Sequence, residues 1–353
     1  MNSLAKTIVL LLPAFPANES ETHWVPTQQL LVRVWKKQYP HIKLVVLSFY
    51  YPVGDTEYNW HGVEVMSFNG AKQRKLRRVF FWNRIWKQLN RIRKENNLVG
   101  IFSCWCGECA LIGHYFGRRY RIAHYCWLCG QDARKTNPMV KWIRPHSEEL
   151  VAMSDFLVTE FYTNHGIRPQ HMIPNAIDPS AFPQELPRVR DIDILGAGSL
   201  SALKRYGLFA EVVQALQQAI PSLRAMLCGD GEDRQKIQAF IRQEKLEDNF
   251  LLAGEKPHRE VLSAMQRTKI FLHTSSYEGF GVACLEALYA GAHVISFSKP
   301  IDKDIPHWHI VHSKEEMIAK ARTLLMDATT PYTPIQLYTM NDTVQSVMAL
   351  FEH

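Results

Sequence analysis

Residues 275–296 read SSYEGFGVACLEALYAGAHVIS, and they hold the most informative pattern of the chain. The apolar run 270–272 precedes it, and apolar side chains then recur at helical spacing until Gly291 ends the pattern. We therefore expect a buried strand, a turn and a helix, in that order. Gly279 and Gly281 lie in the turn, where they can take backbone angles closed to other residues and let a ligand approach the main chain.

Two carboxylates bracket this turn. Glu278 belongs to the loop, and Glu286 belongs to the early turns of the helix. The first N–H groups of a helix have no intrahelical partner and attract phosphate, while a carboxylate accepts hydrogen bonds from sugar hydroxyls. One glutamate alone would be an ordinary solvated side chain, but here two of them stand beside two glycines and a helix start. This combination favours a sugar nucleotide as the ligand.

The same stretch resembles the Glu-x7-Glu motif of retaining glycosyltransferases of family 4, which belong to the group 1 glycosyltransferases. Further segments resemble motifs of that family, in the family's order. Residues 194–200, followed by Lys204, resemble its diphosphate-binding loop. Residues 227–231 resemble the strand end that precedes the nucleotide, and residues 251–254 resemble the segment that lines the base.

Short apolar runs alternate with helix-like stretches along the chain, which predicts parallel sheets covered by helices on both faces. The expected strands are 8–12, 44–47, 99–103, 123–128, 156–159, 192–195, 225–228, 270–273 and 294–297. The resemblance implies an α/β chain of two Rossmann-like domains whose parallel sheets face each other across a cleft, the GT-B fold. In such open sheets, ligands bind at the carboxyl ends of the strands.

The expected domain boundary lies in a proline-rich segment. Residues 173–178 resemble the linker between the two domains of the family, and four prolines fall between residues 174 and 187. We expect an N-terminal acceptor-binding domain at residues 1–178 and a nucleotide-sugar-binding domain at residues 179–335. The resemblance also implies that residues 336–353 form a helix that crosses back to the first domain.

The resemblance assigns roles to residues of the second domain. Glu278 and Lys204 would be the catalytic residues, with Glu278 on the transferred sugar and Lys204 on the diphosphate, and Glu286 would bind the ribose. The implied donor site comprises Gly198, Ser199, Arg205, Gly229, Asp230, Gly254, Gly279, Phe280, Gly281 and Glu286. The leaving diphosphate would help to deprotonate the acceptor on the same face, so the anomeric configuration is retained. No enzyme nucleophile, metal or separate cofactor is expected.

The diphosphate loop departs from the family pattern. An arginine usually follows Gly198 and pairs with the lysine to clamp the diphosphate, whereas here Ser199 occupies that position. Because serine lacks the planar cation that binds phosphate through two hydrogen bonds, we expect Arg205, next to Lys204, to replace it. The pair Gly196-x-Gly198 also matches the start of a nicotinamide dinucleotide fingerprint, but the third glycine is absent from the sequence, so this signal is weak.

The first domain departs from the pattern as well. Residues 127–132 align with the family's strand that ends in a histidine near the transferred sugar, and Cys129 stands in that histidine's place. Gln131 and Asp132 could contact sugar hydroxyls instead, although an aspartate after glycine is also a common turn residue. The first loop, residues 13–26, lacks the double glycine typical of the family. Its candidate acceptor contacts are Glu19, Glu21, His23 and Trp24.

Seven cysteines raise the alternative of a metal site. Cys104, Cys106 and Cys109, followed by Cys126 and Cys129, have a spacing similar to that of zinc or iron–sulfur ligands. However, Cys126 and Cys129 fall in an apolar strand-like run, where their odd separation sends the side chains to opposite faces. Free cysteines are also readily buried as small hydrophobes. We therefore expect no metal and a reducing compartment.

The net charge of +7 is concentrated in residues 72–94, which hold ten Lys or Arg and no Asp or Glu. The apolar side chains of this segment share one helical stripe, with two tryptophans beside it: Phe81, Ile85, Leu89 and Ile92, then Trp82 and Trp86. Such a helix suits an anionic membrane surface. It suits equally well a helix whose stripe packs on the first domain's sheet. No nucleic-acid-binding motif is present.

Composition sets the remaining bounds. The 353 residues are 46% hydrophobic and 21% charged, which is typical of a globular protein. No apolar stretch approaches the roughly 20 residues of a membrane-spanning helix, and the run 8–12 is too short, and cut too soon by Pro13, for a signal peptide. We expect a cytoplasmic protein, or one that is peripheral on the inner face of the membrane.

Together these features predict a hexosyltransferase or related transferase that moves a sugar from a nucleotide diphosphate sugar to an acceptor hydroxyl. Its partners would be a nucleotide sugar and a glycan or glycolipid acceptor, in glycan, polysaccharide or glycolipid assembly, and not a nucleic acid. Two alternatives stay open. One is a nucleotide-sugar epimerase of the same fold, and the other is a catalytically degenerate protein that binds sugar nucleotides without turnover.

Overall fold

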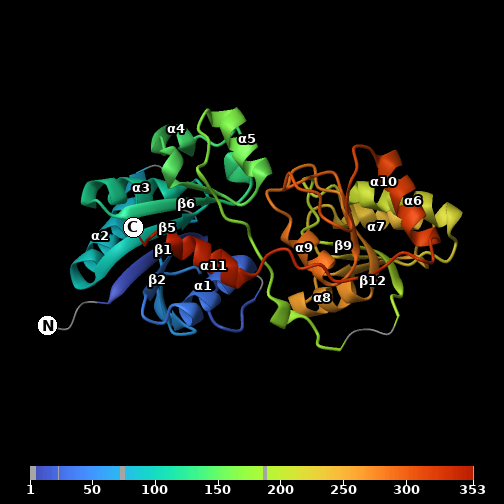
Figure 1. The fold of residues 1–353 in the computed structure, drawn as a ribbon, viewed down its shortest axis with the longest axis horizontal. Helices are drawn as coiled ribbons and strands as arrows, with labels where there is room; N and C mark the ends of the chain where they lie inside the picture. Colours follow the sequence, from blue (N-terminus) through green and yellow to red (C-terminus); the bar gives the residue numbers. More distant parts are fainter. Residues whose placement is uncertain (1–4, 23, 72–75, 186–188, 353) are drawn as a thin grey trace. The chain divides into compact units, whose positions relative to one another are not determined.

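The computed structural model describes residues 5–22, 24–71, 76–185 and 189–352. The chain divides into two compact units, one formed by Met1–Ala176 with Tyr338–His353 and the other by Ile177–Leu337 (Figure 1). Both are α/β units, and over the described residues their strand pairs are parallel apart from one hairpin. The predicted fold class is confirmed.

The first unit is built on an eight-stranded sheet. Its strands are β1 (Lys6–Ala14), β2 (Lys43–Tyr51), β3 (Glu57–Trp60), β4 (Val63–Ser67), β5 (Asn97–Cys104), β6 (Ala123–Leu128), β7 (Leu150–Ala152) and β8 (His171–Met172). Their order is β3-β4-β2-β1-β5-β6-β7-β8, with the antiparallel hairpin β3–β4 at one edge. Strand β1 is almost entirely apolar and buried, because helices cover both faces of the sheet.

The helices of this unit are α1 (Pro26–Gln38), α2 (Leu76–Glu95), α3 (Glu108–Tyr120), α4 (Met139–Ile143), α5 (Asp155–His165) and α11 (Met340–Ala349). Helices α2 and α3 share one core with the face of β1 that carries Val9 and Leu11. Helices α1 and α11 contact each other. The α1 indole, Trp35, meets Phe102 of β5 and donates to the sulfur of Met348 in α11 at 2.9 Å. The C-terminal helix therefore belongs to the first unit.

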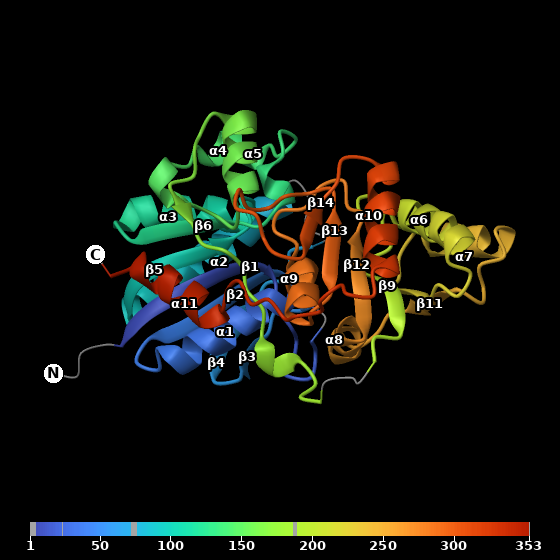
Figure 2. The same ribbon diagram turned by 45° about the vertical axis from the view of Figure 1, so that its right-hand side comes forward.

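The second unit is a six-stranded parallel sheet of order β11-β10-β9-β12-β13-β14. Its strands are β9 (Ile192–Ala197), β10 (Ala225–Cys228), β11 (Phe250–Gly254), β12 (Thr268–His273), β13 (His293–Ser296) and β14 (Trp308–Ile310). Its helices are α6 (Tyr206–Ala219), α7 (Arg234–Gln243), α8 (His258–Gln266), α9 (Val282–Tyr289) and α10 (Lys314–Met326). Figure 2 shows α6, α7 and α10 on one side of this sheet, where they share a core, and α8 and α9 on the other.

The expected strand at residues 156–159 is wrong, because these residues lie in helix α5. Ser154 begins this helix, and its hydroxyl accepts a hydrogen bond from the Leu157 N–H at 3.1 Å. A serine at this position satisfies one of the donors that a helix start leaves unpaired. The strand of this region is the shorter β7, which ends just before the cap.

The apolar stripe of α2 faces the sheet. Phe81, Ile85, Leu89 and Ile92 are each at most 3% exposed and belong to the core of the first unit. Of the two interpretations left open for this stripe, packing on the sheet is the one observed, while Arg77, Lys87 and Lys94 of the same helix are exposed. Residues 72–75 of the basic segment lie outside the described residues. Within the described part of the chain, no helix has both the length and the hydropathy needed to cross a bilayer.

Two neighbouring phenylalanines on α2 test this packing. Phe81 is 2% exposed and Phe80 is 68% exposed. Phe81→Ala should lower the free energy of unfolding by about 3–5 kcal/mol, because it removes a buried ring and leaves a cavity. Phe80→Ala should change it by less than about 0.5 kcal/mol. Urea unfolding followed by tryptophan fluorescence measures both, and equal losses would show that the buried face of α2 is assigned incorrectly.

Candidate functional site

The predicted donor residues lie at the carboxyl ends of four neighbouring strands in the second unit. Gly198 follows β9, Gly229 follows β10, Gly254 ends β11 and Glu278 follows β12. The loops are joined through their backbones, because the Gly198 N–H donates to the Cys228 carbonyl at 3.0 Å and the Gly229 N–H donates to the Gly254 carbonyl at 2.8 Å. The structure therefore brings these glycines and Glu278 to one edge of the sheet, where open α/β sheets bind ligands.

Glu278 and Lys204 form one ion pair. The Lys204 ammonium donates to Glu278 Oε2 at 2.6 Å, and His273 Nε2 lies 3.2 Å from the same oxygen. The Lys204 segment is fixed to the loop after β12, since the Thr274 hydroxyl donates to the Lys204 carbonyl at 2.7 Å. The two predicted catalytic residues therefore meet although 74 positions separate them in the chain.

This contact changes the acidity of Glu278. Burial by itself would raise the pKa of its carboxyl, but the hydrogen bond from His273 and the charge of Lys204 more than offset it and lower the pKa to about 2. Glu278 is therefore ionised at neutral pH, with a side chain that is 22% exposed. An ionised, partly accessible carboxylate can accept hydrogen bonds from sugar hydroxyls.

Glu286 has a partner that the sequence did not reveal. It lies on α9, and its Oε1 is 2.7 Å from Nε2 of His258, the first residue of α8. The hydrogen bond to Glu286 raises the pKa of His258, so the imidazolium form is favoured. The turn before α9 ends at Gly281, whose φ of 77° is in the left-handed region that favours glycine.

The remaining donor candidates differ in accessibility. Ser199 is exposed, whereas the Phe280 side chain is buried, so it offers a ligand only its backbone. Arg205 precedes α6 in a left-handed conformation, and its guanidinium lies 4.8 Å from the centre of the Phe297 ring. Asp230 accepts from Arg234 at 3.3 Å. Replacement of the missing family arginine by Arg205 stays a prediction.

The candidates of the first unit are engaged in loop contacts. The Asp132 carboxylate accepts from the N–H groups of Cys106 at 2.9 Å and Gly130 at 2.7 Å, and it is only 8% exposed. Burial raises the pKa of Asp132 despite these hydrogen bonds. These contacts match the role of a turn residue and leave little of Asp132 for a sugar, whereas Gln131 is exposed and Cys129 is half-buried.

The first loop is held in a similar way. Glu19 accepts from the His61 N–H at 2.8 Å, and Glu21 accepts from the Ala17 N–H at 2.6 Å and from the Tyr51 hydroxyl. Trp24 stacks on Tyr51 with ring centres 4.4 Å apart. His23 lies outside the described residues. The two glutamates therefore fasten this loop to neighbouring segments, and their contact with an acceptor stays a prediction.

The cysteines with metal-like spacing are mostly buried single thiols. Cys104, Cys106, Cys109 and Cys126 are each at most 3% exposed. Among the described residues, the set whose ligand atoms lie close enough for one ion is His114, His124 and Glu149, and no cysteine belongs to it.

Comparisons with known proteins address the second unit and the fold separately. Residues 178–307 match the family model of the glycosyl transferases group 1. A human protein named as part of phosphatidylinositol N-acetylglucosaminyltransferase is 32% identical over 126 residues, which cover 35% of this chain and 26% of that protein. The 2-deoxystreptamine N-acetyl-D-glucosaminyltransferase of Niallia circulans is 30% identical over 112 residues, which cover 32% of this chain and 29% of that protein. The chain thus spans less than a third of the length of these two relatives.

Solved structures match over nearly the whole chain. A mutant of S. aureus TarM, solved in complex with Fondaparinux, alpha-GlcNAc-glycerol and UDP, has a TM-score of 0.69 at 12% identity, and the match covers 99% of this chain and 100% of that chain. Anabaena HepE, solved with UDP and glucose, has a TM-score of 0.67 at 14% identity and covers 98% of this chain and 95% of its own. At this identity, the likeness shows the fold, which is the GT-B fold of two Rossmann-like units. The family match shows that residues 178–307 are similar to the group 1 glycosyl transferases.

The ion pair at the site leads to a prediction on acidity. Lys204→Met should raise the pKa of Glu278 from about 2. Burial raises this pKa, and the variant lacks the lysine charge that lowers it. In the unmodified protein, this depressed pKa contributes stability that is complete above pH 4.5 and is lost as the pH falls toward 2, by an amount of roughly 3 kcal/mol at most. The stability difference between the two proteins should therefore shrink over that window.

Carboxyl carbon NMR shifts of Glu278 measure its pKa, and thermal unfolding at several pH values measures the stability difference. The matched control is Lys236→Met, since Lys236 is 83% exposed and pairs with Asp233 on the surface. An unchanged pKa of Glu278 in Lys204→Met would refute the electrostatic coupling.

Proposed function

We propose that this chain is a retaining glycosyltransferase of family 4 that transfers a sugar from a nucleotide diphosphate sugar to an acceptor hydroxyl. The observation that carries the proposal is the contact of Lys204 and His273 with Glu278 at 2.6 and 3.2 Å, beside the glycine loops of the matched segment. A cation, an ionised carboxylate and the N–H groups of a helix start at one sheet edge are the chemistry that a sugar diphosphate requires.

In this proposal, Lys204 and the N–H groups at the start of α9 stabilise the charge that develops on the leaving diphosphate. Preorganised donors of this kind supply much of the rate acceleration in many enzymes. Glu278 accepts hydrogen bonds from the transferred sugar, and His273 orients the carboxylate. Glu286 binds the ribose, with His258 holding its carboxylate in place. The acceptor binds to the first unit, and no metal or separate cofactor takes part.

The donor proposed for the first experiments is UDP-N-acetylglucosamine. Two structural neighbours were solved with UDP, and two of the sequence relatives are named as N-acetylglucosaminyltransferases. The names belong to the related proteins, and they suggest UDP-N-acetylglucosamine as the first donor to test with this chain.

Release of nucleoside diphosphate from a panel of sugar nucleotides tests the activity. Glu278→Gln should lower kcat by about 100-fold or more, because it removes a charged contact made at the reacting sugar. Glu286→Gln should mainly raise KM for the donor, since it removes a contact to the ribose that is equal in the ground and transition states. Glu211→Gln is the matched control, because Glu211 pairs with Lys314 on α10 in a 45% exposed position.

The outcome also separates the alternatives. Diphosphate release that grows with an added acceptor indicates transfer, whereas conversion of one nucleotide sugar into another indicates an epimerase. Tight binding of sugar nucleotides without any release, under all acceptors tried, would indicate a degenerate binding protein and would refute the proposed activity.

We also propose that the outer face of α2 binds an anionic membrane surface. Arg77, Lys87 and Lys94 are exposed on this helix, and its buried stripe orients them away from the sheet. Basic side chains near an anionic surface contribute about 1 kcal/mol each. This support comes from charge and exposure alone.

Liposome sedimentation tests the membrane proposal. Vesicles with anionic lipid should sediment the protein at low salt and release it at high salt, because salt screens exposed charges. The triple change Arg77→Gln, Lys87→Gln, Lys94→Gln should weaken partitioning on the order of 100-fold. The control changes Arg33, Lys36 and Lys37 on α1 to Gln. An equal loss in the control would mean that net charge, and not the α2 face, governs the association.

A further inference from the structure

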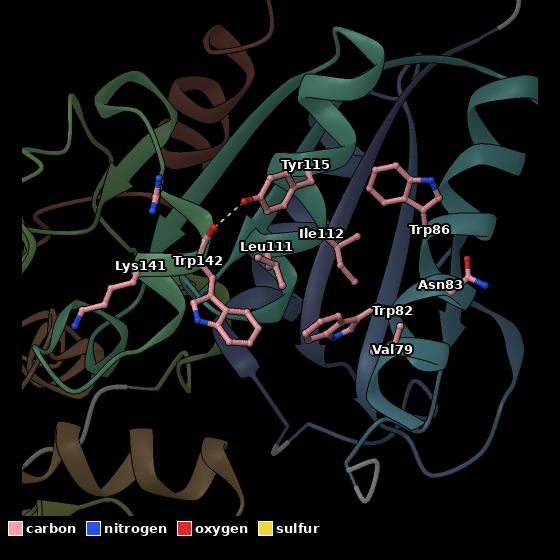
Figure 3. Close-up of a pocket in the computed structure, with 10 residues that line it drawn as sticks. Val79, Trp82, Asn83, Trp86, Leu111, Ile112, Tyr115, Lys141 and Trp142 are labelled. Carbon is pink, nitrogen blue, oxygen red and sulfur yellow. Dashed lines mark hydrogen bonds between the residues drawn. The ribbon is translucent and has the colours of Figure 1, made fainter. Parts of the chain in front are cut away.

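The first unit carries a groove of about 800 Å³ between α2, α3 and α4. Figure 3 shows the Trp142 indole of α4 and the Trp82 indole of α2 in this groove, with Leu111 and Ile112 of α3 between those helices. The Trp86 ring lines the groove further along α2 and packs against Phe116 with ring centres 4.9 Å apart. Three tryptophans thus line one surface hollow.

Much of this lining is apolar yet exposed. Trp142 is 60% exposed, Val79 is 57% exposed and Tyr115 is 47% exposed. A contiguous apolar surface of this kind on a folded protein usually marks a binding site. The walls are held in place, since the Tyr115 hydroxyl donates to the Trp142 carbonyl at 2.7 Å (Figure 3). The groove is therefore a preformed apolar site that a hydrocarbon chain can enter.

The charged side chains that line the groove are both positive, and both lie at α4. Lys141 lies on α4 and Arg144 caps that helix, so both cations belong to the α4 side. None of the ten lining residues is acidic. A ligand that fits both features is an amphiphile, with a hydrocarbon chain between α2 and α3 and an anionic group next to α4.

The groove lies beside the ligand-binding edge of the first sheet. Helices α3 and α4 begin after the carboxyl ends of β5 and β6, and the lining residues of α3 lie in its N-terminal part, up to Tyr115. Asn137 links the α4 wall to the predicted acceptor loop, because its side-chain amide donates to the carbonyls of Cys106 and Asp132 at 2.8 Å each, and its amide oxygen accepts from the Met139 N–H. These hydrogen bonds tie the start of the α4 wall to the loop that carries Gln131 and Asp132.

We propose that this groove binds the hydrocarbon chain of a lipid-linked acceptor whose anionic group lies against Lys141 and Arg144. This inference rests on the proposed glycosyl transfer, and it names the class of acceptor. The acceptor hydroxyl is presented on a head group, while the chain supplies the affinity through burial of apolar surface.

Alkyl phosphates below their micellar concentrations test the groove directly. Dodecyl phosphate should bind in calorimetry and shift the tryptophan fluorescence. Shortening the chain should weaken binding by up to about fourfold for each CH2 lost, which is the full transfer value of a methylene. Dodecyl trimethylammonium should bind at least tenfold more weakly than dodecyl phosphate, because the cations at α4 repel it.

Two neighbouring residues supply a matched pair of variants. Val79→Asp places a charge in the groove and should weaken dodecyl phosphate binding at least tenfold. Phe80→Asp places the same charge on the next residue, which is 68% exposed and does not line the groove, and it should leave binding unchanged. Lys141→Gln with Arg144→Gln should weaken dodecyl phosphate but not dodecyl maltoside. UDP binding, measured in each variant, should stay unchanged.

The results separate this inference from the proposed activity. Equal binding of dodecyl phosphate by Val79→Asp and the unmodified protein, or equal binding of the cationic amphiphile, would overturn the inference even if sugar transfer is observed. Failure to release diphosphate from every sugar nucleotide would overturn the acceptor role, even if the groove binds alkyl phosphates. Support requires both the chain-length dependence of alkyl phosphate binding and the loss of dodecyl phosphate binding in Val79→Asp but not in Phe80→Asp.

Discussion

Backbone-to-backbone packing of two loops is the constraint on which the donor side depends. A Cβ at Gly229 would lie 1.9 Å from the Gly198 carbonyl oxygen, and a Cβ at Gly231 would lie 2.5 Å from that of Leu200. Their φ angles of 142° and 154° are also open mainly to glycine. No side chain separates the loops after β9 and β10, so the two loops pack closely. The segment that follows β9 then carries Lys204 to the loop after β12, where the Thr274 hydroxyl donates to the Lys204 carbonyl. The ion pair with Glu278 follows from this close approach.

That ion pair also determines what a ligand must provide. Breaking a partly buried pair by removing one partner is costly, since the other charge loses its compensation. A diphosphate can approach Lys204 without this cost, because it brings negative charge to the cation. Glu278 then keeps the hydrogen bond from His273, and its remaining acceptor sites can bind hydroxyl groups of the sugar. The proposed donor is therefore an anion with hydroxyl groups, and a neutral sugar alone meets only half of the requirement.

The sequence predicts the strands and helices of the second unit well because their signals are local. Gly198 and Gly229 each follow a strand, and Gly281 precedes a helix. The spacing of apolar residues predicts these strands and this helix, so the positions of the glycines can be predicted from neighbouring residues alone. His258 and His273 were missed, because each becomes relevant only through a carboxylate that folding brings near it. The strand expected at residues 156–159 failed for a related reason. An apolar run of four residues does not distinguish strand from helix, and the cap at Ser154 decides between them.

In the first unit, local sequence patterns predict the site less well, because the contacts of the candidate residues are set by folding. Its polar candidates were chosen by position, but Asp132, Glu19 and Glu21 accept hydrogen bonds from backbone groups of their own and neighbouring loops. The amphipathic stripe of α2 showed that one face is buried but not what covers it. Only the fold reveals that the exposed apolar side chains of α2, α3 and α4 meet in one groove. The groove therefore offers this unit a second kind of recognition surface, because an apolar hollow with cations on one side selects a ligand by its chain and its charge.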